Sequence, residues 1–217
     1  MNPVYSATSA FFRGIFASWF HWNVYNRERV PISGPVILAA NHASFLDPPL
    51  VGCPLPREVN YLARDTLFRL PGVGAYLRAL RAVPVDREGG GGAGLKAILD
   101  RLQMGGAILL FPEGTRSRDG NLQSAKAGIG LTVIKSEAPV VPIRVFGTFE
   151  AFGRSRKWPR PFPVSVKYGL PMRFESLRAE AKVCSKPRLK LIYQAVSDQL
   201  MNEIKRLEPC RDIERFP

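Results

Sequence analysis

Three short segments of the chain are almost entirely apolar, and they constrain the fold more than any other feature. They are VILAA at 36–40, AILLF at 107–111 and VVPIRVF at 140–146. A strand with one face in water alternates apolar and polar side chains, whereas a strand covered on both faces is apolar throughout. Each segment has the length of a strand and is short for a helix. We therefore predict three strands inside a sheet that has helices on both faces.

Strand-like and helix-like patterns alternate along the rest of the chain. Further strands are predicted at 59–63, 82–85 and 164–168, and helical segments at 66–70, 74–80, 95–103 and 130–135. A last amphipathic helix carries apolar side chains at helical spacing, namely Leu189, Ile192, Tyr193, Val196, Leu200 and Ile204. The 217 residues are enough for one sizeable core. We predict a single α/β domain over residues 30–217, with a largely parallel, mixed sheet covered by helices.

Residues 1–29 are predicted to form a separate, amphipathic helical segment. Its aromatic and aliphatic side chains follow the spacing of one helix face, namely Phe12, Ile15, Phe16, Trp19 and Phe20. Arg13, Arg27 and Arg29 supply positive charge nearby. Aromatic side chains with basic neighbours suit the head-group boundary of a membrane, so we expect this segment to associate with one. The alternative is a helix that packs on the core of the domain itself.

The first of the apolar strands runs directly into residues that can carry chemistry. After Ala40 the chain reads NHASFLD, which places the base His42 five positions before the carboxylate of Asp47. Five residues correspond to about 140° around a helix, so the two side chains can meet only in a turn. In a turn at the end of a parallel strand, Asp47 would fix the imidazole tautomer and leave the other ring nitrogen as a general base. The alternative is a capping box in which Asp47 only satisfies helix N–H groups with Ser44.

A second group of functional residues follows the strand at 107–111. The stretch FPEGTRS contains Glu113, Gly114, Thr115 and Arg116. Gly114 would let the backbone approach a ligand closely, and the planar guanidinium of Arg116 suits a phosphate. Lys126 could add a second positive charge. The alternative is an ordinary charged loop, in which a glutamate and an arginine pair at the surface.

Four blocks of the sequence, in this order, resemble those of the glycerolipid acyltransferases. They are NHASFLD (41–47), VPVDR (83–87), FPEGTRS (111–117) and VVPI (140–143). Within that family the blocks are most similar to those of the bacterial 1-acyl-sn-glycerol-3-phosphate acyltransferases, also called lysophosphatidic acid acyltransferases. The resemblance covers about residues 30–170, and the first and third blocks together make a specific signal.

The resemblance implies that an acyl group passes from a thioester to the sn-2 hydroxyl of 1-acyl-glycerol 3-phosphate, which gives phosphatidic acid. The thioester is acyl-CoA or acyl carrier protein, a co-substrate, and neither a cofactor nor a metal is expected. His42 would be the base and Asp47 its orienting carboxylate. The residues implied to hold the glycerol phosphate are Glu113, Gly114, Thr115, Arg116, Arg87 and Lys126. Pro142 lies in the block associated with the acyl donor. Another lysolipid acceptor is a further possibility.

The charge of the chain favours anionic partners. Lys and Arg number 31 against 18 Asp and Glu, a net charge of +13. Residues 151–174 include no acidic residue and carry six basic ones, namely Arg154, Arg156, Lys157, Arg160, Lys167 and Arg173. Together with the resemblance to the glycerolipid acyltransferases, this positive charge predicts a peripheral or monotopic protein on the anionic cytoplasmic face of the cell membrane. No nucleic acid is expected as a partner. The alternative of another class is a non-catalytic basic module that coats membrane or nucleic acid.

Overall fold

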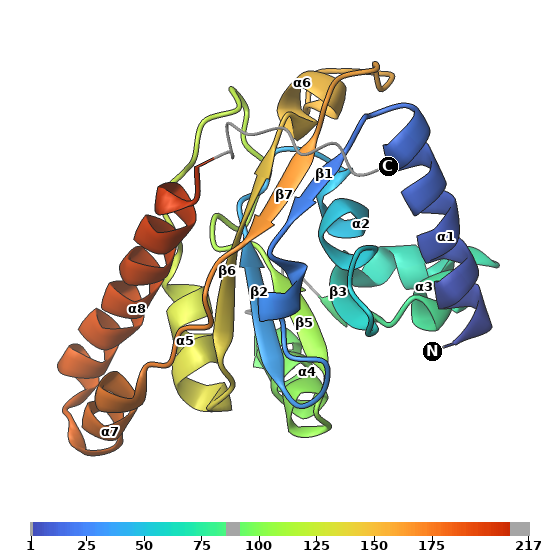
Figure 1. Ribbon diagram of the computed structural model, residues 1–217. Helices are drawn as coiled ribbons and strands as arrows, with labels where there is room; N and C mark the ends of the chain where they lie inside the picture. The colour runs from blue at the N-terminus through green and yellow to red at the C-terminus, as the bar shows by residue number, and fades with distance from the viewer. Residues whose placement is uncertain (1, 86–91, 209–217) are drawn as a thin grey trace.

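The computed structural model describes residues 2–85 and 92–208, which form one α/β domain around a seven-stranded sheet (Figure 1). The strands are β1 (Asn23–Tyr25), β2 (Val36–Ala40), β3 (Val59–Arg64), β4 (Ala82–Val85), β5 (Ala107–Leu110), β6 (Val140–Phe146) and β7 (Ser165–Tyr168). The α-helices are α1 (Pro3–Ser18), α2 (Asp47–Gly52), α3 (Val73–Ala79), α4 (Gly92–Gln103), α5 (Ala127–Ser136), α6 (Thr148–Phe152), α7 (Glu175–Val183) and α8 (Lys186–Arg206). Two 3-10 helices, η1 (Arg27–Arg29) and η2 (Asp65–Arg69), complete the described elements.

The sheet is mixed and mainly parallel, as the sequence predicted. Its strand order is β1-β7-β6-β2-β5-β3-β4. The central strand β2 pairs in parallel with β5 on one side and with β6 on the other, and β3 and β4 continue the same direction. β7 runs antiparallel to β6, and β1 pairs in parallel with β7. The carboxyl ends of β2, β5 and β6 therefore lie next to one another.

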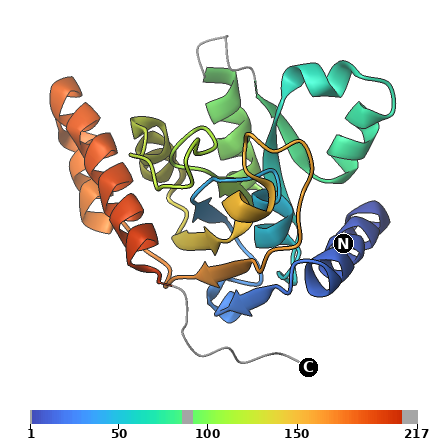
Figure 2. The same ribbon diagram turned by 90° about the horizontal axis from the view of Figure 1, so that it is seen from above.

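Both faces of the sheet are buried, which explains the apolar strands. Along β2, Val36, Leu38 and Ala40 point to a core shared with α1 and α2, whereas Ile37 and Ala39 point to a core shared with α4, α5 and α8. Viewed from above, α4, α5 and α8 lie on one side of the strands and α1 on the other (Figure 2). Every position of such a strand needs an apolar side chain, because no face meets water.

The predicted elements differ from the observed ones mainly where elements are short. β2, β4 and β6 have the predicted bounds, and β5 ends one residue earlier than predicted. The edge strand β1 and the helices α6 and α7 were not predicted. β1 has only three residues, too few for a periodic pattern, and it exists because it pairs with β7. Helix α2 begins at Asp47 and has Pro48 in its first turn, where a proline costs no helix hydrogen bond.

The N-terminal segment is part of the same domain, because α1 packs on the core and residues 23–25 form β1. Phe16 and Phe20 are buried, and Phe12 and Ile15 pack against the same core. Phe11 and Trp19 lie on the outer face and are exposed. Most of the apolar helix face that was expected to enter a membrane therefore packs against the core. Only the aromatic side chains of Phe11 and Trp19 stay exposed among those named here. No helix in the described part of the chain combines the length and apolar character that a bilayer crossing requires.

Candidate active site

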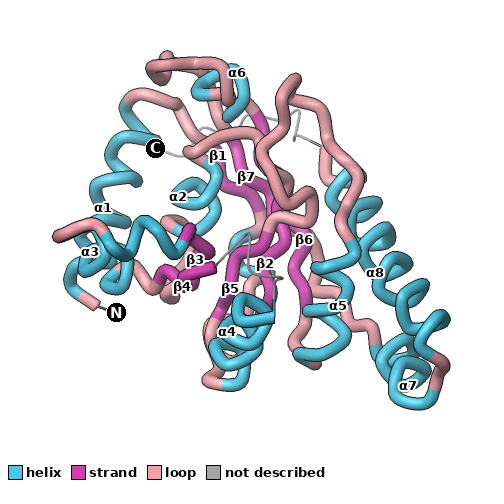
Figure 3. Tube along the Cα trace, turned by 180° about the vertical axis from the view of Figure 1, so that it is seen from behind, coloured by secondary structure: helices cyan, strands magenta, loops and turns pink. Residues whose placement is uncertain are grey.

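The expected site residues gather where three loops meet at the carboxyl ends of the parallel strands. These loops are 41–46 after β2, 111–126 after β5, and 147–164, which contains α6, after β6. Seen from behind, they form the crowded upper end of the molecule (Figure 3). Parallel strands bring their carboxyl ends to one edge of the sheet, and this is where α/β folds place reactive groups.

His42 and Asp47 form a hydrogen-bonded pair, with 2.8 Å between Nδ1 of the ring and Oδ2 of the carboxylate. The Asp47 side chain is 0% exposed, whereas that of His42 is 17% exposed. The same Oδ2 also accepts the backbone N–H groups of Ala43 and Ser44, each at 2.7 Å. Asp47 therefore orients the imidazole and also fixes the loop before α2, because the two N–H groups that it accepts belong to that loop and not to the helix, as a capping box would require. The other ring nitrogen, Nε2, is left for a substrate.

The loop after β5 holds His42 through both its backbone and its ring. The His42 N–H donates to Oε1 of Glu113 (3.0 Å), and its carbonyl accepts the Ser117 N–H (2.8 Å). The Phe111 ring stacks on the imidazole, with 3.8 Å between centroids and 13° between planes. Together these contacts fix the position of the imidazole and leave little freedom for its plane to turn. A preorganised base is the arrangement that general base catalysis requires.

Glu113 connects the two loops, and only 2% of its surface is exposed. Its second oxygen accepts the Gln123 N–H at 3.4 Å. Burial raises the pKa of the Glu113 carboxyl from 4.5 to about 7, and the negative charge of Asp47 adds to the rise, whereas the N–H groups of His42 and Gln123 oppose it. The Glu113 carboxyl thus accepts one hydrogen bond from the loop after β2 and one from the loop after β5, and so holds the two loops together.

The residues expected to bind phosphate lie on the outer side of the same loop. Gly114 has a φ of +71°, a left-handed conformation that favours glycine, and a Cβ there would come within 3.0 Å of the Lys126 side chain. The guanidinium carbon of Arg116 lies 3.5 Å from the centroid of the Phe45 ring. Thr115 is half-buried and Lys126 is exposed. The structure therefore brings the glycine and both cations together near the His42 loop.

One expected site residue, Pro142, is not part of this cluster, and another, Arg87, lies outside the described residues. Pro142 is buried inside β6, where it pairs with Ala39, and its carbonyl accepts the Gly169 N–H at 2.7 Å. It belongs to the strand that supports the site and not to the loops themselves. Arg87 lies in the stretch 86–91, outside the described residues.

Other supporting residues were not identified from the sequence. The Asn41 side chain is buried and exchanges two hydrogen bonds with the backbone of Val145, at 2.8 Å and 3.3 Å. This ties the start of the His42 loop to the end of β6. Oγ of Ser44 donates to the Phe152 carbonyl at 2.7 Å and so ties the loop to α6. Both residues lie inside the NHASFLD block, and this position next to His42 is the one feature of the sequence that could have identified them.

An apolar cavity of about 210 Å³ opens beside the same loop. Its lining includes Phe12 of α1, Phe45, Pro49 of α2, Tyr61, Leu77 and Leu80. Among the residues that the structure describes, no group of three His, Cys, Asp or Glu side chains is placed to hold a metal ion. The site thus combines a histidine–carboxylate pair, a basic loop and an apolar cavity.

Known proteins resemble this chain in sequence and in fold. The family described as Acyltransferase matches residues 21–146. A 1-acyl-sn-glycerol-3-phosphate acyltransferase of Bacillus subtilis is 32% identical over 120 residues, which cover 55% of this chain and 59% of that protein. The chloroplastic LPAT1 of Arabidopsis thaliana, named as the same type of enzyme, is 33% identical over 129 residues, which cover 58% of this chain and 36% of that one. The chain thus matches well under two thirds of the length of these relatives.

A solved structure extends the likeness to nearly the whole chain. The crystal structure of the 1-acyl-sn-glycerophosphate (LPA) acyltransferase PlsC from Thermotoga maritima aligns with a TM-score of 0.71 and 26% sequence identity. The alignment covers 94% of this chain and 80% of the other.

Proposed function

The chain belongs to the acyltransferase family, and from this premise we propose that it acylates the sn-2 hydroxyl of 1-acyl-glycerol 3-phosphate to give phosphatidic acid. The acyl donor is a thioester, either acyl-CoA or acyl carrier protein. One observation carries the proposal. The His42–Asp47 pair, 2.8 Å apart, lies beside a loop that presents Arg116 and Lys126. Relatives named as 1-acyl-sn-glycerol-3-phosphate acyltransferases support the choice of acceptor.

In the proposed mechanism His42 acts first as a base and then as an acid. Asp47 holds the proton on Nδ1, so Nε2 accepts the proton of the acceptor hydroxyl while its oxygen attacks the thioester carbonyl. The resulting imidazolium is stabilised by the Asp47 carboxylate. The tetrahedral intermediate collapses, its C–S bond breaks, and the leaving sulfur takes the proton from Nε2. A thiol with a pKa of about 8.5 leaves readily, so no serine nucleophile is required.

The acceptor phosphate is proposed to bind at Arg116 and Lys126. A guanidinium offers two parallel N–H groups to a phosphate, and an ammonium adds a point charge. Glu113 contributes indirectly, because its carboxyl oxygens accept the backbone N–H groups of His42 and Gln123. Gly114 contributes through the backbone conformation that a side chain would disfavour. Either donor meets the same chemical requirements, so the choice between them is left to experiment.

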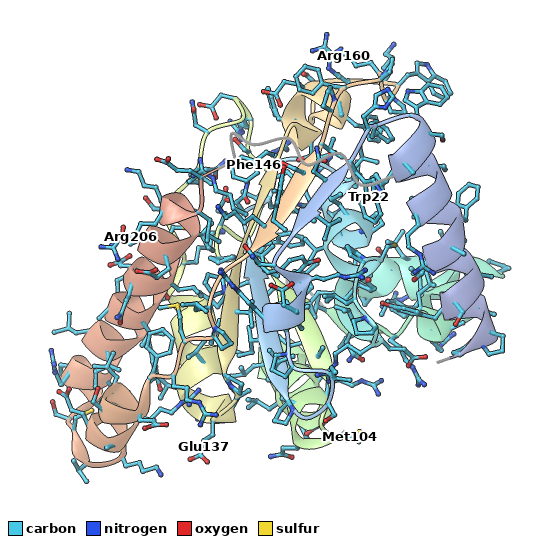
Figure 4. All side chains as sticks on the ribbon, viewed as in Figure 1. Trp22, Met104, Glu137, Phe146, Arg160 and Arg206 are labelled. Atoms are coloured by element: carbon cyan, nitrogen blue, oxygen red, sulfur yellow. The ribbon has the colours of Figure 1, made fainter. Side chains whose placement is uncertain are left out.

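An anionic membrane on its cytoplasmic side is the proposed source of the lipid substrate. The exposed side chains of Phe11 in α1, Trp19 directly after α1, and Trp158 after α6 can enter the head-group boundary. Four exposed basic residues flank Trp158 in the sequence, namely Arg154, Arg156, Lys157 and Arg160. Arg160 lies at the upper end of the molecule, next to α6 (Figure 4). Binding at this end would bring lipid head groups close to His42.

A mass-spectrometric screen of the purified protein tests the proposal. The protein is incubated with 1-acyl-glycerol 3-phosphate or with other lysolipids, each with acyl-CoA or acyl carrier protein, and with His42→Ala as the control. We expect phosphatidic acid from the wild type and none from the variant. A different acylated lysolipid as the main product would change the acceptor but keep the chemistry. No acyl transfer from either donor to any acceptor would refute the proposed function and favour a non-catalytic module.

A further inference from the structure

Phe45 is an exposed aromatic residue that neither core explains. Its ring is 63% exposed although it lies between His42 and Asp47, in the middle of the catalytic loop. Two of its neighbours are a charged and an aromatic group: the Arg116 guanidinium carbon lies 3.5 Å from the ring centroid, and the Phe152 ring centroid lies 6.2 Å away. Phe45 therefore contacts the guanidinium that is proposed to bind the acceptor phosphate.

The Arg116 guanidinium lies over the Phe45 ring, and this contact restricts its movement. A guanidinium is planar, and stacking on an aromatic ring uses its flat face, whereas its N–H groups point outward in the plane. Arginine otherwise loses substantial rotamer freedom when it binds a ligand. A cation that is already held in place avoids part of this cost when a phosphate binds.

The Phe45 ring is a stable platform because its loop is fixed on both sides. Oγ of Ser44 donates to the Phe152 carbonyl and accepts the Leu46 N–H at 3.0 Å. The ring itself lines the apolar cavity together with Pro48 and Pro49 of α2. Arg116 is anchored near the same loop, because the N–H of the next residue, Ser117, donates to the His42 carbonyl at 2.8 Å.

We propose that Phe45 is a positioning residue that holds the Arg116 guanidinium in the place where it binds the acceptor phosphate. The inference rests on the proposed function, in which Arg116 contacts that phosphate. Phe45 then contributes to the acceptor KM and has little effect on kcat, because it improves binding of the ground state and of the transition state equally. The fixed loop that carries both Phe45 and His42 places the phosphate at a set distance from the base.

A double-mutant cycle tests the proposal with Phe45→Leu, Arg116→Ala and the double variant. We expect Phe45→Leu to raise the acceptor KM by about 2-fold to 30-fold, the usual range for a guanidinium–aromatic contact, with kcat nearly unchanged. Phe45→Tyr keeps the aromatic face, so its acceptor KM should stay close to that of the wild type. In the Arg116→Ala background, Phe45→Leu should have no further effect. Leu191→Ala is the control for loss of an exposed apolar side chain, because Leu191 is 60% exposed and lies in α8.

Calorimetric titration of each variant with 1-acyl-glycerol 3-phosphate, without an acyl donor, gives a second measurement that does not depend on turnover. The dissociation constant should rise by the same factor as the KM. If Arg116→Ala raises the KM and Phe45→Leu adds its own full effect, the proposal is overturned while the phosphate assignment stands. If Arg116→Ala leaves the KM unchanged, the phosphate assignment fails and the proposal fails with it.

Discussion

Replacing Asp47 with asparagine removes one charge from the site and changes almost nothing else. Oδ2 of Asp47 accepts hydrogen bonds from His42, Ala43 and Ser44, whereas its Oδ1 is buried and accepts no hydrogen bond from the described residues. An asparagine oxygen in the Oδ2 position keeps all three bonds, and the amide nitrogen takes the place of Oδ1. We therefore expect Asp47→Asn to fold, with a loss of stability of roughly 1 kcal/mol from weaker hydrogen bonds.

The expected loss of activity follows from the charge pair that forms during the reaction. When His42 accepts a proton, its imidazolium lies beside the Asp47 carboxylate, with 2.8 Å between Nδ1 and Oδ2. For two unit charges with centres about 4 Å apart and an effective dielectric constant of about 20, the attraction is about 4 kcal/mol. The Asp47→Asn variant lacks this attraction, which stabilises the transition state and not the bound substrate. Its kcat should therefore fall about 10³-fold, with the acceptor KM nearly unchanged.

The assay is steady-state formation of the acylated lipid by mass spectrometry, together with thermal unfolding of each variant. Asp100→Asn, an exposed carboxylate on α4, is the matched control and should keep full activity. A folded Asp47→Asn protein that keeps more than about a tenth of the wild-type kcat would refute the electrostatic reasoning. Loss of the folded state would instead show that Asp47 acts mainly by holding the loop 41–46 in place.

Three further predictions concern neighbouring groups. His42→Ala should abolish acyl transfer with little change in thermal unfolding, because a loop histidine contributes little to the core; turnover by the folded variant would contradict the mechanism. The raised pKa of Glu113, about 7, means that the folded state binds more protons than the unfolded state between pH 4.5 and 7. The contribution of Glu113 to the free energy of unfolding should therefore be greatest below pH 4.5 and fall by roughly 3 kcal/mol as the pH rises through 7, seen as a difference between the urea unfolding of the wild type and of Glu113→Gln; equal pH profiles of the two proteins would refute it. Replacing both Phe11 and Trp19 with serine should weaken binding to anionic liposomes without unfolding, whereas Phe16→Ala should destabilise the protein by about 3–5 kcal/mol; unchanged co-sedimentation would exclude α1 as the anchor.

The sequence by itself determined the centre of the fold and the chemical groups of the site. The segments 36–40, 82–85 and 140–146 are strands with the predicted bounds, and the first and last of them are apolar because both of their faces are buried. The base and the carboxylate could be identified because NHASFLD and FPEGTRS each follow such a strand. These two strands are parallel neighbours in the sheet, so the residues that follow them in the sequence meet at one site.

The tertiary structure alone decided which side chains act on one another. Apolar helical spacing is the same for a helix that packs on a core and for one that enters a membrane, so only the packing of Phe16 on the sheet shows where that face lies. The burial of Glu113 against the backbone of His42, and the stacking of Arg116 on Phe45, join residues that are distant in the sequence. Such contacts depend on how separate loops meet, and local patterns in a single chain carry no information about that meeting.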